Sequence, residues 1–185
     1  MRIYWLTIAA PLFSACASHA PPAVSQAPSI HSFRNGLAGT HANSSSVTLR
    51  VAADSSSERE DVLFVDYPAP SSDPASRDVR LDAERTNWSA GKAISFRARP
   101  ASAIRLSVSF IDRNGVVYTS WTNLQAGVWQ PVRIELAAIR PNPYFQPPGA
   151  KMGAPLDVTE VKFVAFAPQD QQAGRIALAQ IILTN

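Results

Sequence analysis

Apolar residues recur at every second position through most of the chain beyond Val47, and this alternation constrains the fold more than any other feature. A spacing of two places side chains on one face of a β-strand, whereas an amphipathic helix requires a period near 3.6. The sequence therefore predicts an all-β fold, an antiparallel β-sandwich of the jelly-roll type. The candidate strands are residues 47–51, 61–67, 79–83, 94–98, 104–110, 117–121, 132–136, 161–165 and 176–182.

Asn114 and Gly115 form the clearest turn signal, because a two-residue type I′ turn needs a positive φ at both positions. With these residues as the loop, Val108 faces Trp121 and cross-strand partners share a face of the sheet. One face would join the core and the other would stay open. The predicted core face holds Leu106, Val108, Phe110, Val117 and Trp121, and the predicted open face holds Arg105, Ser107, Ser109, Ile111, Tyr118, Ser120 and Thr122.

Residues 1–16 have the order of an export signal. Arg2 precedes an apolar stretch over residues 3–13, too short to span a bilayer, and small residues then lead to Cys16, the only cysteine. The position of Cys16 resembles a bacterial lipobox, in which the cysteine is lipidated and becomes the new N-terminus. An ordinary secretory signal cut near Ala17 or Ala20 is the alternative. We expect an exported cell-envelope protein, held on the outer membrane by a lipid anchor.

Residues 17–43 are rich in Pro, Ala and Ser, so we expect a tether there and a binding domain over residues 44–185. The three histidines, His19, His31 and His41, all fall in this tether. A Ser-His-Asp triad or a Cys-His dyad needs an imidazole held by packed structure, and a structural zinc needs several Cys or His ligands. Both chemistries are excluded unless the tether folds back onto the domain.

A proline-rich segment over residues 140–155 interrupts the strands, because proline cannot donate to a strand ladder. It carries the adjacent aromatic residues Tyr144 and Phe145. Long irregular loops in compact domains are often functional. The alternative is that both rings cover an end of the sandwich.

Five segments carry a resemblance to known proteins: residues 88–96, 106–115, 127–134, 156–161 and 174–178. They resemble galactose-binding-like jelly rolls, in particular family 11 carbohydrate-binding modules and the complex I intermediate-associated family. The resemblance runs in order through residues 44–185 and involves mostly core and turn residues. It implies a non-catalytic β-sandwich and, as in the carbohydrate-binding members, an open concave face that receives a sugar chain.

An aromatic ring can lie against the apolar C–H face of a sugar while neighbouring polar side chains bond its hydroxyl groups. Tyr118 is therefore the first candidate, and Arg97 would extend the same face if its strand lies alongside. Trp88, Trp121 and Trp129 are interpreted as core residues, because burial alone explains such rings. The candidate ligand-binding residues are Tyr118, Arg105, Ser107, Ser109, Ser120, Arg97 and Tyr144.

We expect a membrane-tethered, non-catalytic module that binds a polysaccharide or glycan. The alternative is an envelope lipoprotein that docks or assembles a protein partner through residues 140–155. A glycosidase would need two paired carboxyl groups, and Asp112 and Glu135 lie on different segments with no shared motif.

No cofactor is expected. A structural calcium ion bound through Asp157 and Glu160 is the alternative, although two carboxylates supply only part of the roughly six to eight oxygen ligands that calcium takes. No nucleic-acid partner is expected, because the formal net charge is only +3 and the basic residues are scattered along the chain.

Overall fold

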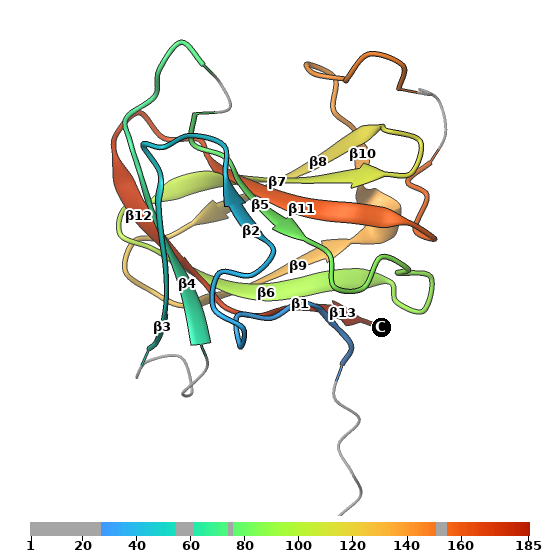
Figure 1. Cartoon of the computed structure of the whole chain (residues 1–185), viewed down its shortest axis with the longest axis horizontal. Coiled ribbons are helices and arrows are strands. Elements are labelled where there is room, and N and C mark those ends of the chain that lie inside the picture. Colours follow the sequence, from blue (N-terminus) through green and yellow to red (C-terminus); the bar gives the residue numbers. More distant parts are fainter. Residues whose placement is uncertain (1–26, 55–60, 74–75, 151–154) are drawn as a thin grey trace, which may run out of the picture.

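The computed structural model describes residues 27–54, 61–73, 76–150 and 155–185. These residues form two antiparallel β-sheets that pack face to face (Figure 1). The predicted all-β jelly-roll sandwich is confirmed. One 3-10 turn, Leu136–Ala138, is the only helical element in the described ranges, and none of their helices is long and apolar enough to cross a membrane.

The two sheets are named A and B. Sheet A has the order β1 (Ser29–His31), β13 (Ile181–Thr184), β6 (Ala93–Pro100), β12 (Gly174–Leu178), β4 (Asp61–Tyr67) and β3 (Thr48–Ala53), and β9 (Gln130–Glu135) also pairs with β6. Sheet B has the order β10 (Arg140–Pro141), β8 (Val117–Leu124), β7 (Ile104–Asp112), β11 (Val161–Pro168), β5 (Val79–Asp82) and β2 (Thr40–Ala42).

The inner faces of the two sheets supply one hydrophobic core. Trp88 is fully buried, donates its indole N–H to the carbonyl of Arg85 at 2.7 Å and meets Phe110 edge to face. Phe96 of sheet A meets Phe166 of sheet B in the same geometry, with ring centroids 5.2 Å apart. These contacts join the sheets. They confirm the interpretation of Trp88 as a core residue.

The predicted strand segments agree with the structure except at the C-terminus. Each of the first eight overlaps one strand, whereas residues 176–182 are divided between β12 and β13. The division lies at Ala179, whose N–H donates to the carbonyl of Arg97 at 2.9 Å. The short strands β1, β2 and β10 were not predicted.

The β7–β8 hairpin has a three-residue loop, residues 113–115, and not the predicted two-residue loop. Phe110 pairs with Tyr118, and Ser107 pairs with Trp121. Gly115 has a φ of 73°, as the last position of a three-residue loop closed by a bulge requires. The predicted register is therefore wrong by one residue, and such a slip turns every side chain of β8 to the other face.

The buried Asp112 carboxylate explains the longer loop. Its Oδ1 accepts hydrogen bonds from the backbone N–H groups of Asn114 at 2.9 Å and Val116 at 3.2 Å. Its Oδ2 accepts from the N–H of Asp157 at 3.2 Å. An aspartate that bonds an amide two residues ahead starts a turn at its own position. The loop therefore begins after Asp112, one residue earlier than Asn114-Gly115 alone indicates.

Residues 27–43 belong to the folded domain, so the predicted tether is wrong over that range. β1 pairs with β13, and β2 pairs with β5. Ile30, His31 and Phe33 are buried. The domain therefore begins before β1 and not at residue 44. The predicted signal segment and Cys16 lie outside the described residues.

This boundary can be tested by truncating one side chain of the N-terminal segment. We expect Phe33→Ala in the full chain to lower the free energy of unfolding by about 3–5 kcal/mol, because it empties a buried site. Leu37→Ala is the control, because Leu37 lies between β1 and β2 but is 42% exposed. Urea denaturation measures both variants. Equal stability of the two would contradict the placement of this segment in the core.

Candidate functional site

The outward side of sheet B is called here the open face. Its composition follows from the register, because paired residues share a face. Ser107 pairs with Trp121 and Ala167, and Arg80 pairs with Ala165 and His41. The open-face residues are His41, Arg80, Asp82, Arg105, Ser107, Ser109, Ile111, Val117, Thr119, Trp121, Asn123, Phe163, Ala165 and Ala167.

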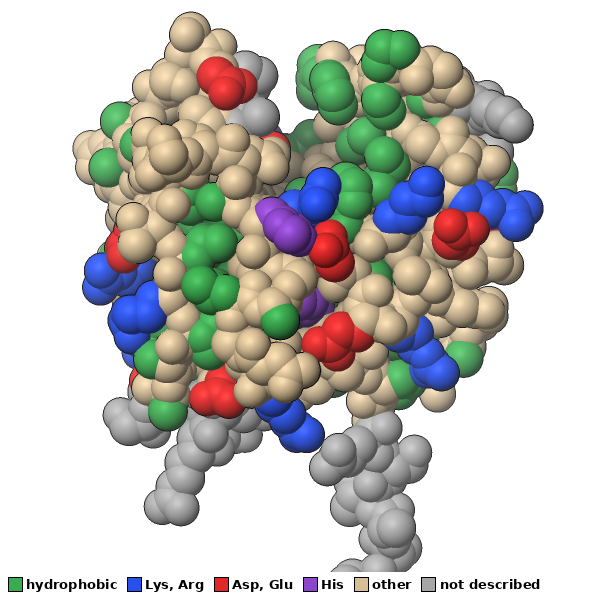
Figure 2. Space-filling model, viewed as in Figure 1, with side chains coloured by type: hydrophobic (Ala, Val, Ile, Leu, Met, Phe, Trp, Pro, Cys, Tyr) green, Lys and Arg blue, Asp and Glu red, His purple; other side chains and the backbone are tan. Residues whose placement is uncertain are grey.

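A cleft of about 410 Å³ lies on the open face. Small side chains on the neighbouring strands β7 and β11 form its floor, and larger residues from the flanking segments and strands surround it. Figure 2 shows it as a hollow between two lobes, where Figure 1 places the loop after β4 and the loop after β10. The floor consists of Ser107, Ser109, Ala165 and Ala167, and the surrounding residues are Asn43, Asp78, Arg80, Val117, Asn142, Phe145, Phe163 and Gln169.

Two arginine–aromatic stacks lie on the open face. The Arg80 guanidinium carbon is 5.2 Å from the centre of the Phe163 ring, and Arg80 Nε is 3.4 Å from Asp82 Oδ1. The Arg105 guanidinium carbon is 5.1 Å from the centre of the Trp121 ring. Stacking holds each guanidinium beside an apolar surface. The face thus combines flat apolar groups with hydrogen-bond donors.

Asp78 is a carboxyl group that lines the cleft. Burial and, to a smaller extent, the nearby Asp73 carboxylate together raise its pKa to about 6. A raised pKa means that the folded protein binds this proton more tightly than the unfolded chain does. The ionised carboxylate therefore costs stability, and it gives the cleft a hydrogen-bond acceptor.

The structure places four of the candidate residues on or beside this site. Ser107 and Ser109 line the cleft floor, and Arg105 lies on the same face beside Trp121. Tyr144 is 88% exposed on the loop that flanks the cleft and adjoins Phe145, which lines it.

Three candidate residues lie elsewhere. Tyr118 is 0% exposed and faces the core, because β8 is turned over by the one-residue shift in register. Ser120 pairs with the buried Val108 and lies on the same inner side. Arg97 lies in sheet A, where it pairs with Pro131, so its strand does not extend the open face. These three placements correct the sequence interpretation.

Two tryptophans also differ from the sequence interpretation. Trp121 takes the place on the open face that was predicted for Tyr118, and it is 39% exposed. Trp129 is only half-buried, and its ring lies 5.4 Å from Arg97 and 5.1 Å from Arg99 in sheet A. Neither is a core residue.

Other cleft residues were missed for a different reason. Placing Val79 and Leu81 in the core already puts Asp78, Arg80 and Asp82 on the outer side of their strand. Alternation does not show which strand lies beside which, so no local pattern predicts that Arg80 lies next to Phe163.

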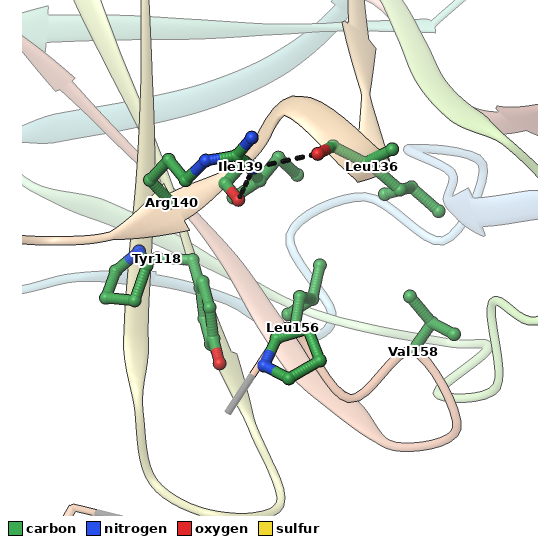
Figure 3. A pocket seen from close by; sticks show the side chains of 9 residues that line it. Tyr118, Leu136, Ile139, Arg140, Leu156 and Val158 are labelled. Carbon is green, nitrogen blue, oxygen red and sulfur yellow. Dashed lines mark hydrogen bonds between the residues drawn. The ribbon is translucent and has the colours of Figure 1, made fainter. Parts of the chain in front are cut away.

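Tyr118 instead borders a separate groove of about 440 Å³ at one end of the sandwich (Figure 3). Its ring points from β8 toward Leu156, and the Arg140 guanidinium donates hydrogen bonds to the carbonyls of Ala137 and Ile139. Burial raises the pKa of Tyr118 to about 12, with further contributions from the Asp112 and Asp157 carboxylates. The groove is mainly apolar and offers few polar groups to orient a ligand.

The folded domain contains two of the histidines that were predicted to lie in a tether. His31 Nδ1 is 2.8 Å from the carbonyl oxygen of Asp82, and His41 Nε2 is 2.7 Å from Asp82 Oδ2. The premise that the folded domain lacks histidine is therefore wrong. The His41–Asp82 pair lies on the open face, but the described residues show no hydroxyl or thiol nucleophile bonded to His41.

No group of three or more His, Cys, Asp or Glu side chains able to hold a metal ion occurs in the described part of the chain. Asp157, a candidate calcium ligand, has its carboxylate bonded by the Thr159 hydroxyl and N–H and by Arg113 Nε at 2.7 Å. These hydrogen bonds lower the pKa of Asp157, the Thr159 hydroxyl contributing most.

The raised pKa of Asp78 predicts a pH-dependent effect on stability. Its contribution to the stability of the folded state is full below pH 4 and is lost as the pH rises through about 6. Asp78→Asn removes the titration, so the melting temperature of the variant relative to the natural protein should be higher at pH 8 than at pH 4. Asp61→Asn, at an exposed position, is the control. An equal difference at both pH values would contradict this assignment.

No protein-family model matches the sequence, and no curated protein matches it. Solved structures do match, with 54 similar chains. A family 11 carbohydrate-binding module from Clostridium thermocellum, in complex with a β-1,3-1,4-mixed-linked tetrasaccharide, gives a TM-score of 0.62 at 18% identity. The match covers 80% of this chain and 88% of the module.

A family 11 module of a cellulosomal cellulase from the same organism also gives a TM-score of 0.62, at 19% identity, and covers 80% of this chain and 86% of its own. An exo-β-agarase matches with a TM-score of 0.61 at 12% identity. That match covers 85% of this chain but 25% of the agarase. At these identities the likenesses establish the fold.

Proposed function

We propose that this protein is a non-catalytic module that binds a polysaccharide chain on the open face of sheet B. The observation that carries the proposal is the cleft itself. It has a floor of small side chains, and the residues around it include two aromatic rings, Phe145 and Phe163. Its other lining residues include polar side chains that donate or accept hydrogen bonds. Aromatic rings suit the C–H faces of a sugar, while Arg80, Asp78 and Asn142 suit its hydroxyl groups.

Similar structures support the class of ligand. The two family 11 modules share the sandwich architecture over most of their length, and one holds a mixed-linked tetrasaccharide. The cleft lies on the outward side of sheet B, a position that suits a long chain extending beyond the cleft.

The carboxyl groups support binding without hydrolysis. A typical glycosidase places two carboxyl groups on either side of the scissile bond. Among the described residues that line the cleft, Asp78 is the one carboxyl group. Asp112 is buried in the hairpin turn, and Glu135 pairs with Arg133 in sheet A, so these two residues do not form a pair.

We also propose that a lipid anchor at Cys16 tethers the chain to the outer membrane, and the position of β1 agrees with a cleft that stays accessible in that arrangement. β1 lies at the bottom of the view in Figure 1, whereas the loops that flank the cleft lie at the top. A chain tethered through its N-terminus to the outer membrane would leave the cleft accessible to a polysaccharide.

Binding is tested with two tryptophan variants of the full chain on a panel of neutral and acidic polysaccharides embedded in native gels. Trp121→Ala should reduce affinity for the retained polysaccharide by about tenfold, because Trp121 is the exposed ring of the open face. Trp129→Ala is the matched control on sheet A and should retain wild-type affinity. Retention of the natural protein by no polysaccharide, or equal loss in both variants, would refute the proposal.

Lipidation is tested in a bacterial host by labelling with a clickable fatty acid. The natural sequence should incorporate the label and fractionate with outer membranes, and Cys16→Ser should abolish both, because the thiol is the acceptor. Cleavage of the natural chain after Ala17 or Ala20 without labelling would instead identify an ordinary secretory signal.

A further inference from the structure

The loop over residues 142–146, called here the rim loop, presents two adjacent exposed aromatic residues beside the cleft. Tyr144 is 88% exposed and Phe145 is 63% exposed. Phe145 also lines the cleft, where Phe163 and Arg80 are among the other lining residues. A single exposed apolar residue needs no explanation. Tyr144 and Phe145 differ from such a residue because hydrogen bonds hold their backbone in place.

Asn142 fixes the first half of the rim loop. Its side-chain Oδ1 accepts hydrogen bonds from the backbone N–H groups of Tyr144 at 2.8 Å and Phe145 at 3.1 Å. Its Nδ2 donates to the Thr119 hydroxyl at 2.9 Å, and its own N–H donates to the Val117 carbonyl at 2.8 Å. Both partners lie on β8, on the open face.

Gln146 fixes the second half through its side-chain amide. The Oε1 atom accepts from the N–H of Val117 at 2.9 Å, while Nε2 donates to the carbonyls of Val117 at 2.8 Å and Asn142 at 3.0 Å. The side chain of Gln146 therefore bonds both the N–H and the carbonyl of Val117, as the backbone of a paired strand would. β10 pairs with the edge of β8 at Arg140 and Pro141, and Gln146 extends this pairing to Val117.

These bonds hold the loop in one place relative to the cleft before any ligand arrives. The prolines Pro143, Pro147 and Pro148 further restrict the backbone. A loop that is ordered in advance loses little conformational entropy on binding. An apolar ring held in water beside a cleft is thus poised for contact with a ligand.

We propose that the rim loop is a preformed wall of the cleft, in which Phe145 contacts a bound polysaccharide and Tyr144 extends that contact, while Asn142 and Gln146 are positioning residues. This inference rests on the proposed function. It adds that the ligand is held between two surfaces, the floor of sheet B and the aromatic rim. That arrangement suits a neutral sugar chain with apolar C–H surfaces on both sides of its rings.

The test is a double-mutant cycle in the full chain, measured by affinity electrophoresis with the polysaccharide that retains the natural protein. Phe145→Ala should lower affinity about tenfold, and Tyr144→Ala less. Gln146→Ala should lower affinity about threefold or more in the natural background and leave it unchanged in the Phe145→Ala background. Val128→Ala, 53% exposed on another loop, and Gln180→Ala, between β12 and β13, are controls that should retain affinity.

A second measurement does not depend on a ligand. Exchange of the Val117 amide hydrogen should accelerate in Gln146→Ala, because its side-chain acceptor is lost. Unchanged exchange would overturn the positioning role.

The outcomes separate the two proposals. If Trp121→Ala loses affinity while Phe145→Ala and Gln146→Ala keep it, the rim loop is not part of the binding site and the proposed function stands. If no polysaccharide retains the natural protein, both proposals are overturned. Capture of an envelope protein that Phe145→Ala abolishes, without polysaccharide retention, would also overturn both and favour a protein partner.

Discussion

The turn at Asp112 decides which side chains of β8 lie on the open face and which face the core. Its carboxylate bonds the amides of Asn114 and Val116 and so sets a three-residue loop between β7 and β8. Because strand side chains alternate, that single residue of register buries Tyr118 and exposes Trp121. A buried tyrosine beside a carboxylate and an exposed tryptophan beside an arginine are two consequences of the same turn.

The cleft exists because small residues occupy its floor while larger residues from neighbouring strands and loops surround it. Serine and alanine on β7 and β11 keep its floor low, and the loops that follow β4 and β10 rise on either side. Asp78 lies there although burial makes its charge costly, since its pKa is about 6. Groups that reduce stability in this way are often kept for binding. The amide groups of Asn142 and Gln146 complete the arrangement by fixing the rim loop to the edge of β8.

Strand alternation predicted the fold class and the strands that form its core, because burial on one side of a sheet leaves a period of two in the sequence. It placed Arg105, Ser107 and Ser109 on the open face. The prediction of which β8 side chains lie on each face was wrong because Asn114-Gly115 fits two loop lengths. Only the hydrogen bonds of the Asp112 side chain decide between these lengths. Short edge strands such as β1 and β2 leave no period to detect. Pairing between distant strands, such as β5 with β11, does not show in local sequence.

Amide chemical-shift mapping of the full chain, titrated with an oligosaccharide of the polysaccharide that retains it, would locate the bound sugar on the surface. If the sugar binds on the open face of sheet B, the largest shifts should fall on Ser107, Ser109, Ala165 and Phe145, and Arg133 on sheet A should change little. Shifts concentrated on residues of the outer side of sheet A, or on residues that line the groove beside Tyr118, would contradict binding on the open face.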